Sequence, residues 1–282
     1  MTTNVGRGVG KLDAEQIARQ NPSLIVLRHP SPGLSFYLVN VRIPPFDNAK
    51  VREAINEAMD RSFILRTNTF ATGVVGGPVF PGSKFDLTPE QWAQLPGYGP
   101  NMEQRRARAR QLLQEAGFGS GLQVELMYVA DDTENQDKAE AMVQLLDAVG
   151  ITVKLAPRAR AETRTRERDG QFQMWTHGYG QPSLDPAATF GTHYLKSSGR
   201  NFHGMVNPRI EELYQQQLSL VDDEKRKPLI QEMVREAVRD SALNVLYWRD
   251  EAVGYWPYVK NVVAPPTRYS NAAKLEIVWL DR

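Results

Sequence analysis

Residues 44–61 constrain the fold of this chain more than any other stretch of its sequence. Two prolines favour extended backbone at its start, and Asp47 or Asn48 then caps a helix. One face of that helix is an apolar stripe at spacings of three and four residues: Val51, Ala54, Ile55, Ala58 and Met59. The opposite face carries Arg52, Glu53, Asn56 and Glu57. A predicted strand at 35–40 precedes it, so the pattern indicates a strand leading into a capped amphipathic helix, with nothing catalytic in the unit.

Alternation between strands and helices predicts an α/β fold. Residues 122–130 and 151–155 are typical of strands, and an amphipathic helix at 135–149 separates them. This order implies a parallel βαβ unit with a right-handed crossover. A helix at 160–169 and a strand at 172–177 extend the same layer.

Both ends of the chain are predicted to contain interrupted strands. Residues 23–28 and 35–40 form two strands with a Pro-Ser-Pro-Gly turn at 30–33 between them. Further strands are expected at 243–248, 253–258 and 275–280. A helix pair, 208–221 and 222–240, precedes them.

Composition excludes several classes of function. The 282 residues carry 34 basic and 33 acidic side chains, and this balance of charge argues against nucleic acid as a partner. No cysteine is present, which excludes disulfides and thiolate metal sites. No apolar run approaches the roughly 20 residues that span a bilayer, so no membrane insertion is expected. The polar, glycine-rich residues 1–11 lack the apolar core of a signal peptide, so the chain as given is not expected to be exported.

The order of motifs resembles one family. A strand ending in Asn40 is followed by Pro-Pro-Phe-Asp and then by Val-Arg-x-Ala-Ile-Asn-x-Ala-Met-Asp-Arg at 51–61. This order is similar to that of the extracytoplasmic solute-binding proteins, family 5, of peptide and nickel ABC importers, and the similarity covers about the C-terminal half of such proteins. The resemblance implies a periplasmic location and ABC permease subunits as partners. It also implies a small-molecule or peptide-like ligand, such as a peptide, an opine or a sugar, and no cofactor.

The same resemblance implies a two-lobed architecture. We expect an α/β, periplasmic-binding-protein-like (type II) second lobe with an incomplete first lobe, and hence a truncated binding protein. Residues 1–43 would be a remnant of lobe I, 44–245 lobe II, and 246–282 the return to lobe I. The crossings at 40–45 and 243–248 are expected side by side, and the flanks are expected to pair in a separate sheet.

Candidate ligand-binding residues lie at 173–186, where a strand runs into a Gly/Pro loop. The resemblance makes Trp175 a wall of the cleft, with Tyr179 as its neighbour and Asp185 nearby. Asn40, at the crossing between lobes, is a fourth candidate. The structural alternative is that Trp175 is core and Asp185 caps the helix at 186–194. Peptide-binding members carry an acid about three positions after the Trp, where this chain has Gly178, so a ligand other than a free-amine peptide is predicted.

Other functions remain as alternatives. A ligand-sensing domain of a regulator with the same fold, or a fragment without function, fits the same residues. A hydrolase is disfavoured because no nucleophile elbow, zinc-protease helix or cysteine nucleophile occurs. His177, His193 and His203 lack the compact spacing of a metal site. We therefore predict a binding protein with no catalytic residue and no metal.

Overall fold

A mixed six-stranded sheet organises the computed structural model, which describes residues 11–69, 71–181, 183–263 and 277–281. Its strand order is β2-β6-β1-β5-β3-β4. The strands are β1 (Ile25–Val39), β2 (Gly73–Val75), β3 (Leu122–Val129), β4 (Ile151–Arg158), β5 (Met174–Gly180) and β6 (Leu243–Tyr255). Strands β3, β4 and β5 are parallel, whereas β1 is antiparallel to both β5 and β6. The predicted α/β class with a parallel βαβ unit is confirmed.

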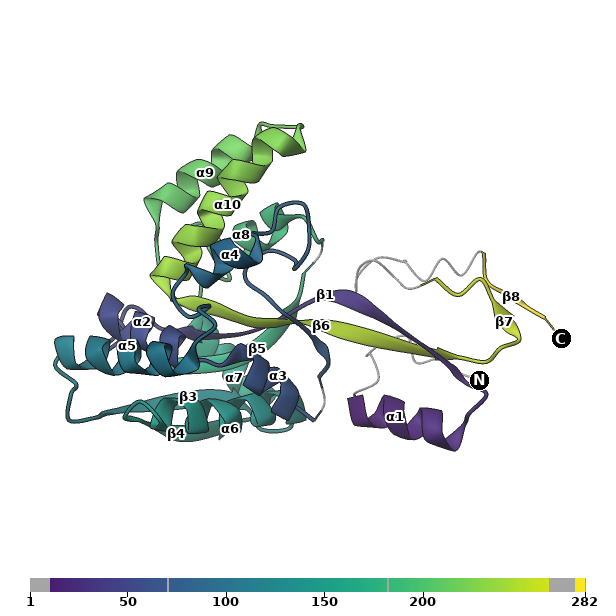
Figure 1. The fold of residues 1–282 in the computed structure, drawn as a ribbon, viewed down its shortest axis with the longest axis horizontal. Coiled ribbons are helices and arrows are strands. Elements are labelled where there is room, and N and C mark those ends of the chain that lie inside the picture. The colour runs from purple at the N-terminus through teal and green to yellow at the C-terminus, as the bar shows by residue number, and fades with distance from the viewer. Residues whose placement is uncertain (1–10, 70, 182, 264–276, 282) are drawn as a thin grey trace.

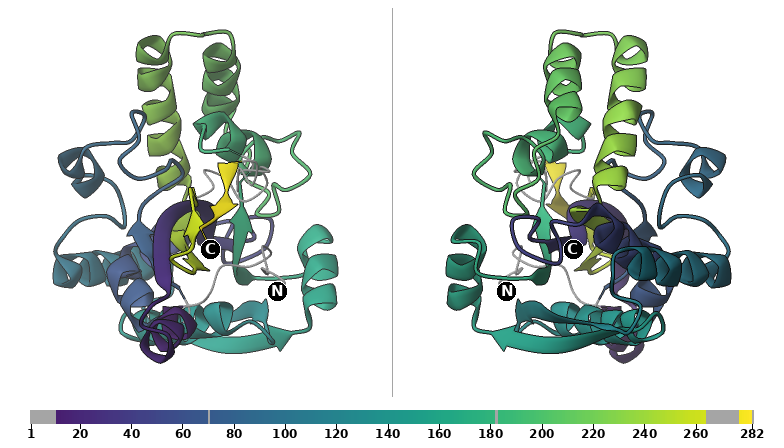
Figure 2. Two further views of the ribbon diagram at one scale, coloured as in Figure 1. Left: turned by 90° about the vertical axis from the view of Figure 1, so that its right-hand side faces the viewer. Right: turned by 90° about the vertical axis from the view of Figure 1, so that its left-hand side faces the viewer.

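Helices cover both faces of this sheet (Figures 1 and 2). They are α1 (Lys11–Gln20), α2 (Ala49–Ala58), α3 (Arg61–Thr67), α4 (Pro89–Ala93), α5 (Met102–Glu115), α6 (Thr133–Asp147), α7 (Arg160–Arg168), α8 (Pro186–His193), α9 (Pro208–Leu218) and α10 (Asp223–Asp240). One core lies between the sheet and α2, α3, α5 and α6. A second core lies on the other face, where α8, α9 and α10 pack. In the part of the chain that is described, no helix combines the length and apolar character needed to cross a membrane.

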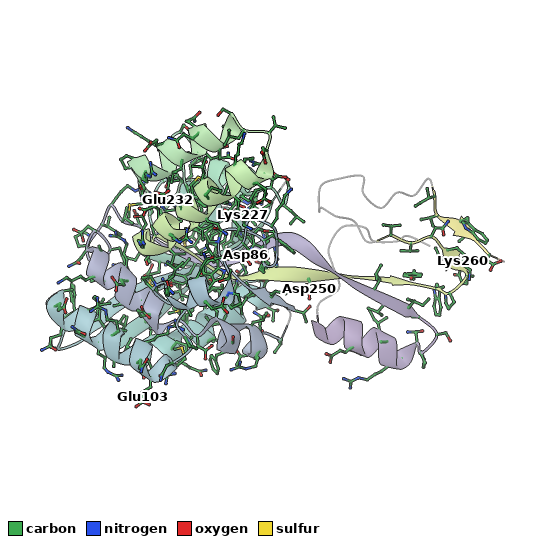
Figure 3. The ribbon with its side chains drawn as sticks, turned by 45° about the horizontal axis from the view of Figure 1, so that its top comes forward. Asp86, Glu103, Lys227, Glu232, Asp250 and Lys260 are labelled. Carbon is green, nitrogen blue, oxygen red and sulfur yellow. The ribbon has the colours of Figure 1, made fainter. Side chains whose placement is uncertain are left out.

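Helices α2–α10 and the sheet that they cover form the body of the molecule. Strands β1 and β6 are long and extend together beyond this body (Figure 1). They pair from Leu38 and Leu243 out to Ile25 and Tyr255, with register shifts at 30–34 and 35–36. A small sheet of β7 (Val259–Lys260) and β8 (Trp279–Leu280) lies beyond them. Most side chains gather around the body, as Figure 3 shows.

Four expectations about these strands differ from the structure. Residues 30–33, which were predicted to form a turn, are extended backbone inside β1. Proline is tolerated in a strand at a bulge, and the register of β1 and β6 shifts between Pro30 and Leu34. Residues 243–255 likewise form one strand. As a result residues 25–33 and 249–255 of the flanks continue the sheet of the body, whereas β7 and β8 form the separate two-stranded sheet. Residues 243–248 run beside 34–38 rather than beside 40–45. The boundaries at 43/44 and 245/246 stay predictions. Of the strand predicted at 275–280, residues 275 and 276 lie outside the described residues.

The polar face of α2 is mostly buried: of its four residues only Glu53 is partly exposed. Asn48 is the cap, and its side chain accepts a hydrogen bond from the Lys50 backbone. Arg52 donates to the backbone oxygens of Phe46 and Asp240 at 2.9 and 2.8 Å. Asn56, Glu57 and Arg61 are also buried. These polar side chains therefore connect α2 to neighbouring loops, while the apolar stripe fills the core.

Candidate ligand-binding site

The end of β5 projects beyond its neighbour β3. The pairing between the two strands stops at Met127 and Trp175, so residues 176–180 of β5 continue past it with β1 on their other side. The first turns of α6 lie against this part of β5, where Lys138 Nζ donates to the His177 carbonyl oxygen at 3.2 Å. This edge also lies where β1 and β6 leave the body (Figure 1).

A buried charged network occupies this place, and we call it the Arg249 cluster. It consists of Ser35 on β1, Glu134 and Lys138 on α6, and Tyr247 and Arg249 on β6. Glu134 accepts hydrogen bonds from Arg249 at 3.0 Å and from Tyr247 at 3.0 Å. Lys138 Nζ lies 3.7 Å from Glu134 and donates to Ser35 at 2.8 Å. The Lys138 side chain is fully buried, whereas that of Arg249 is 20% exposed, so Arg249 is the member of the cluster that reaches solvent.

Burial and mutual attraction set the charges of this cluster. Burial alone would raise the pKa of Glu134, but Arg249 and Lys138 outweigh it and lower that pKa to about 2. Burial lowers the pKa of Lys138 to about 8, although Glu134 opposes the shift. Burial, with Lys138 and Arg249, lowers the pKa of His177 to about 3. At neutral pH, Glu134 is therefore ionised, Lys138 is mostly protonated and His177 is neutral.

Two glycines flank the Arg249 guanidinium. A β-carbon built on Gly33 of β1 would lie 2.8 Å from Nε, and one built on Gly178 of β5 would lie 3.5 Å from Nη2. The side chain of Arg249 thus extends from β6 across β1 to β5. Sequence reasoning missed this residue and Glu134, because they are 115 positions apart and nothing local links them. The pair Glu134 and Lys138 has i,i+4 spacing, which in a sequence more often marks an exposed helix face.

Trp175, His177 and Tyr179 lie at alternate positions on β5. Trp175 is 1% exposed and stacks on His177 with ring centroids 4.8 Å apart. Its Nε1 has no hydrogen-bond partner among the described residues. Tyr179 is only partly buried; its hydroxyl group donates to Glu167, and its ring stacks on His193. Trp175 therefore offers no free face here, and the ligand roles of Trp175 and Tyr179 stay predictions.

Asn40 lies at the opposite end of β5 from Tyr179. Its amide donates to the backbone oxygens of Gly170 and Phe172 at 2.9 and 3.3 Å, and its own N–H donates to Gln173. The seven residues of β5 separate the two ends by roughly 20 Å. Trp175 and Tyr179 therefore lie together, with ring centroids 6.4 Å apart, whereas Asn40 lies away from Tyr179, and the binding role of Asn40 stays a prediction.

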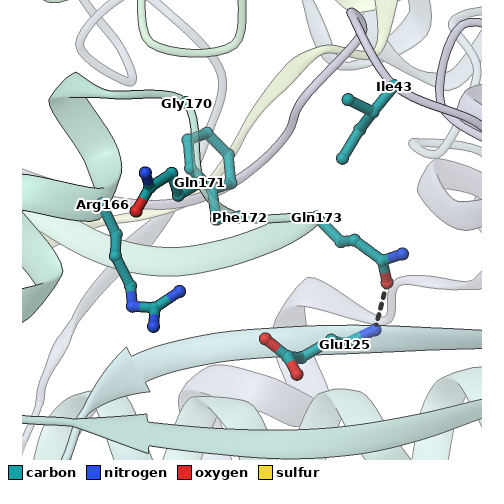
Figure 4. Close-up of a pocket in the computed structure, with 7 residues that line it drawn as sticks. All are labelled: Ile43, Glu125, Arg166, Gly170, Gln171, Phe172 and Gln173. Carbon is teal, nitrogen blue, oxygen red and sulfur yellow. Dashed lines mark hydrogen bonds between the residues drawn. The ribbon is translucent and has the colours of Figure 1, made fainter.

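An open depression of about 540 Å³ lies near Asn40 (Figure 4). Its lining residues are Ile43, Glu125, Arg166, Gly170, Gln171, Phe172 and Gln173. Glu125 and Arg166 give it one charge of each sign. It opens far from the Arg249 cluster, and we do not assign a ligand to it.

Asp185 caps α8 as predicted. Its carboxylate accepts a hydrogen bond from the Ala187 backbone at 2.8 Å, and Pro186 occupies the first helical position. The same carboxylate also pairs with Arg226 of α10 at 2.8 Å. A role for Asp185 in ligand binding stays a prediction, since these contacts explain its position by structure alone.

Replacing Asp185 with Ala is expected to lower the free energy of unfolding by about 1–2 kcal/mol. The cap contributes about 1 kcal/mol, and the pair with Arg226 adds little because the Asp185 side chain is 39% exposed. Asp185→Asn keeps a capping oxygen and removes the charge, so it is expected to lose less than half as much. Urea unfolding of the two variants measures the difference, and equal losses would contradict the capping role.

His193 and His203 are buried and make hydrogen-bond contacts with other residues of the core. His203 Nε2 lies 3.0 Å from the His193 carbonyl oxygen, and His193 Nε2 lies 3.0 Å from the amide of Gln181. Among the described residues, no group of three or more His, Asp or Glu side chains is arranged to hold a metal ion.

Comparison with known proteins shows relatives over most of the chain. Residues 8–201 match the family described as bacterial extracellular solute-binding proteins, family 5 middle. The periplasmic oligopeptide-binding protein OppA of Escherichia coli K12 is 26% identical over 231 residues, which are 79% of this chain and 41% of OppA.

Solved structures show the same fold. The substrate-binding protein CtaP of Listeria monocytogenes has a TM-score of 0.81 at 16% identity, over 98% of this chain and 55% of CtaP. The binding protein AgaA of A. tumefaciens R10, in complex with agropinic acid, has a TM-score of 0.77 at 22% identity, over 96% of this chain and 55% of AgaA. The chain thus spans about half the length of these proteins. The match over residues 8–201 places it among the family 5 bacterial extracellular solute-binding proteins, as the sequence resemblance implied.

Proposed function

We propose that this chain supplies the ligand-holding lobe of the substrate-binding component of an ABC importer. The family assignment and the relationship to OppA support a binding role rather than catalysis. One observation carries the proposal for the site: Arg249 lies where β5 and β2 stop pairing with β1 and β6, and where these two strands continue alone. In a two-lobed protein, a ligand is enclosed between the lobes at such a crossing. A periplasmic location and contact with permease subunits are part of the same proposal.

The ligand class is a small solute other than an ordinary free-amine peptide. Gly178 stands beside Arg249, so the space next to β5 is bordered by a cation. Relatives bind different solutes: OppA is an oligopeptide-binding protein, and AgaA was solved with agropinic acid. Tyr179 is partly exposed and lies on the face of β5 opposite Gly178, so it would contact only a part of the ligand that reaches around the end of β5. Trp175 would not contact the ligand itself. Its ring packs against the rings of His177 and Tyr179 and would hold them in position.

A ligand screen tests this function. Peptides, opines, sugars and small organic acids are added at 10 mM, and the thermal midpoint of the chain is followed by scanning fluorimetry. A solute present at 100 times its Kd stabilises by about 2.7 kcal/mol, which is roughly 5–10 °C for a chain of this size. A cognate solute is expected to raise the midpoint and to give a saturable isotherm in calorimetry. Failure of every solute to do so would contradict a binding function.

A second measurement separates an importer from a sensing domain. The chain is added to liposomes that contain the permease and ATPase subunits of its importer. A transport component is expected to stimulate ATP hydrolysis when its ligand is present. A chain that binds ligand but leaves hydrolysis unchanged would favour the sensing role instead.

A further inference from the structure

Glu167, in the last turn of α7, is a buried acidic residue without an ion pair among the described residues. It is 4% exposed, and the one hydrogen bond that its carboxyl group accepts from a described residue comes from the Tyr179 hydroxyl group of β5. Buried acidic side chains are normally paired with a cation. The missing partner at Glu167 is therefore a feature that needs a physical explanation.

Two arginines lie near this carboxyl group. The Arg200 guanidinium lies 5.1 Å from the centroid of the Tyr179 ring, and the hydroxyl group of the same ring reaches Glu167. Arg164 is one turn before Glu167 on α7, and its charge also acts on that carboxyl group. Both arginines are exposed, and neither forms an ion pair with a described acid. Arg200 and Glu167 are thus neighbours across one aromatic ring.

The surroundings keep Glu167 protonated at neutral pH. Burial raises the pKa of Glu167 to about 8, although the hydrogen bond from Tyr179 and the charges of the two arginines oppose the shift. Burial and Glu167 raise the pKa of Tyr179, so its hydroxyl group keeps its proton. His177 and His193, whose rings contact Tyr179, are neutral because burial lowers the pKa of each to about 3. Among the described groups that face Glu167, its own carboxyl group is therefore the one that titrates just above neutral pH.

The loop between α8 and α9 carries Arg200 and has room to move at its tip. Ser198 and Asn201 fix the loop on either side of the tip, through hydrogen bonds to backbone oxygens. A β-carbon built on Gly199 would meet no heavy atom within 4 Å, so the tip is open on that side. Among the described residues, the Arg200 guanidinium is held by its contact with the Tyr179 ring and by no ion pair.

We propose that Glu167 is a pH-dependent latch for the loop between α8 and α9. While Glu167 is neutral, Arg200 lies on the Tyr179 ring. When Glu167 ionises, the guanidinium moves from that ring to the carboxylate, and the tip of the loop moves with it. A charge-assisted hydrogen bond to a buried carboxylate is stronger than an exposed cation–π contact, and this difference sets the direction of the movement. The latch belongs to this chain alone and does not depend on a bound ligand.

A pH titration followed by carbon-detected NMR tests the latch. The Glu167 carboxyl carbon, Arg200 Cζ and Gly199 Cα are followed from pH 6 to pH 9.5 in 13C-labelled chain. All three signals are expected to change with one midpoint at about pH 8. Nuclear Overhauser contacts between the Arg200 side chain and the Tyr179 ring are expected to disappear over the same range. These contacts report the movement itself rather than the change in charge.

Substitutions assign the movement to Glu167 and Arg200. Glu167→Gln imitates the neutral acid and keeps an acceptor for Tyr179, so the loop signals are expected to stay unchanged up to pH 9.5. Arg200→Gln removes the incoming partner and is expected to raise the pKa of Glu167 by about 0.5 or more. Arg164→Gln is the matched control: it removes an equal charge from α7, and it is expected to raise that pKa less and to leave the movement of Gly199 intact.

Three results would overturn the latch. A Glu167 midpoint below pH 6 would show that the carboxyl group is already ionised at neutral pH. Contacts between Arg200 and the Tyr179 ring that persist after Glu167 ionises would show that the guanidinium does not move. A loop transition that survives in Glu167→Gln would assign the movement to another group. If Glu167→Gln does not fold, the unmodified chain and Arg200→Gln, a surface substitution, decide between these results.

Discussion

Lowering the pH from 6.5 to 4.5 is expected to reduce the free energy of unfolding by about 5 kcal/mol. The cause is that His177, His193 and His203 are held neutral in the folded chain. Burial lowers the pKa of His177 and His193 to about 3 and that of His203 to about 4. Below pH 6.5 these three histidines bind protons in the unfolded chain but not in the folded chain. The free energy of unfolding therefore falls as the pH falls.

Two buried carboxyl groups, Glu167 and Asp240, work in the opposite direction because burial raises the pKa of each. Burial raises the pKa of Glu167 to about 8, so between pH 8 and 4.5 the folded chain holds a proton there that the unfolded chain releases. The net difference between pH 6.5 and 4.5 is then about two protons, which corresponds to about 2.7 kcal/mol per pH unit. Since domains are stable by about 5–15 kcal/mol, a loss of this size brings the chain close to its unfolding midpoint.

Urea unfolding at pH 6.5, 5.5 and 4.5 measures this slope. His203→Gln keeps an amide donor near the His193 carbonyl oxygen and removes one titrating group, so its slope is expected to be shallower by about 1.4 kcal/mol per pH unit. Glu167→Gln is expected to make the slope steeper by a similar amount. A stability that stays level down to pH 4.5 would refute the account.

Replacing Arg61 with Ala is expected to cost about 3–5 kcal/mol of stability, the largest effect of any single substitution proposed here. Arg61 is 4% exposed and donates to three oxygens: Val245 O at 2.8 Å, Gly97 O at 2.6 Å and Asn56 Oδ1 at 2.7 Å. Its guanidinium also lies 3.9 Å from the centroid of the Tyr98 ring. Hydrogen bonds to a charged group contribute about 1.5–3 kcal/mol each, and the oxygens left behind would be buried without a donor.

Two further variants make the test specific. Arg61→Lys retains the charge but cannot present a planar fork to three oxygens, so an intermediate loss of about 2 kcal/mol is expected. Arg66, in the last turn of the same helix, is exposed, and its replacement by Ala is expected to change stability by less than about 0.5 kcal/mol. Chemical denaturation with a constant m-value compares all three; a loss below 1 kcal/mol for Arg61→Ala would show that the surrounding loops rearrange freely.

Local sequence determined the helices and most of the strands. Periodic apolar residues and capping side chains placed α6 and α10 within two residues of their observed bounds, because a cap or a stripe involves contacts a few residues apart. Asp185 was likewise identified as a cap from Pro186 alone. The motif at 44–61 also indicated the family, which the comparisons confirm.

The tertiary structure decided what the polar residues of those elements do. Arg52, Asn56 and Arg61 share a helical pattern with exposed positions, yet the neighbouring loops and β6 cover them, and no local signal reports that cover. The Arg249 cluster joins β1, α6 and β6 across more than 100 residues of chain. Hydrogen bonds and charge pairs of this kind depend on which strands become neighbours in the sheet. The sequence by itself therefore determined the elements and the family, whereas the charged site exists only through the order in which the sheet brings those elements together.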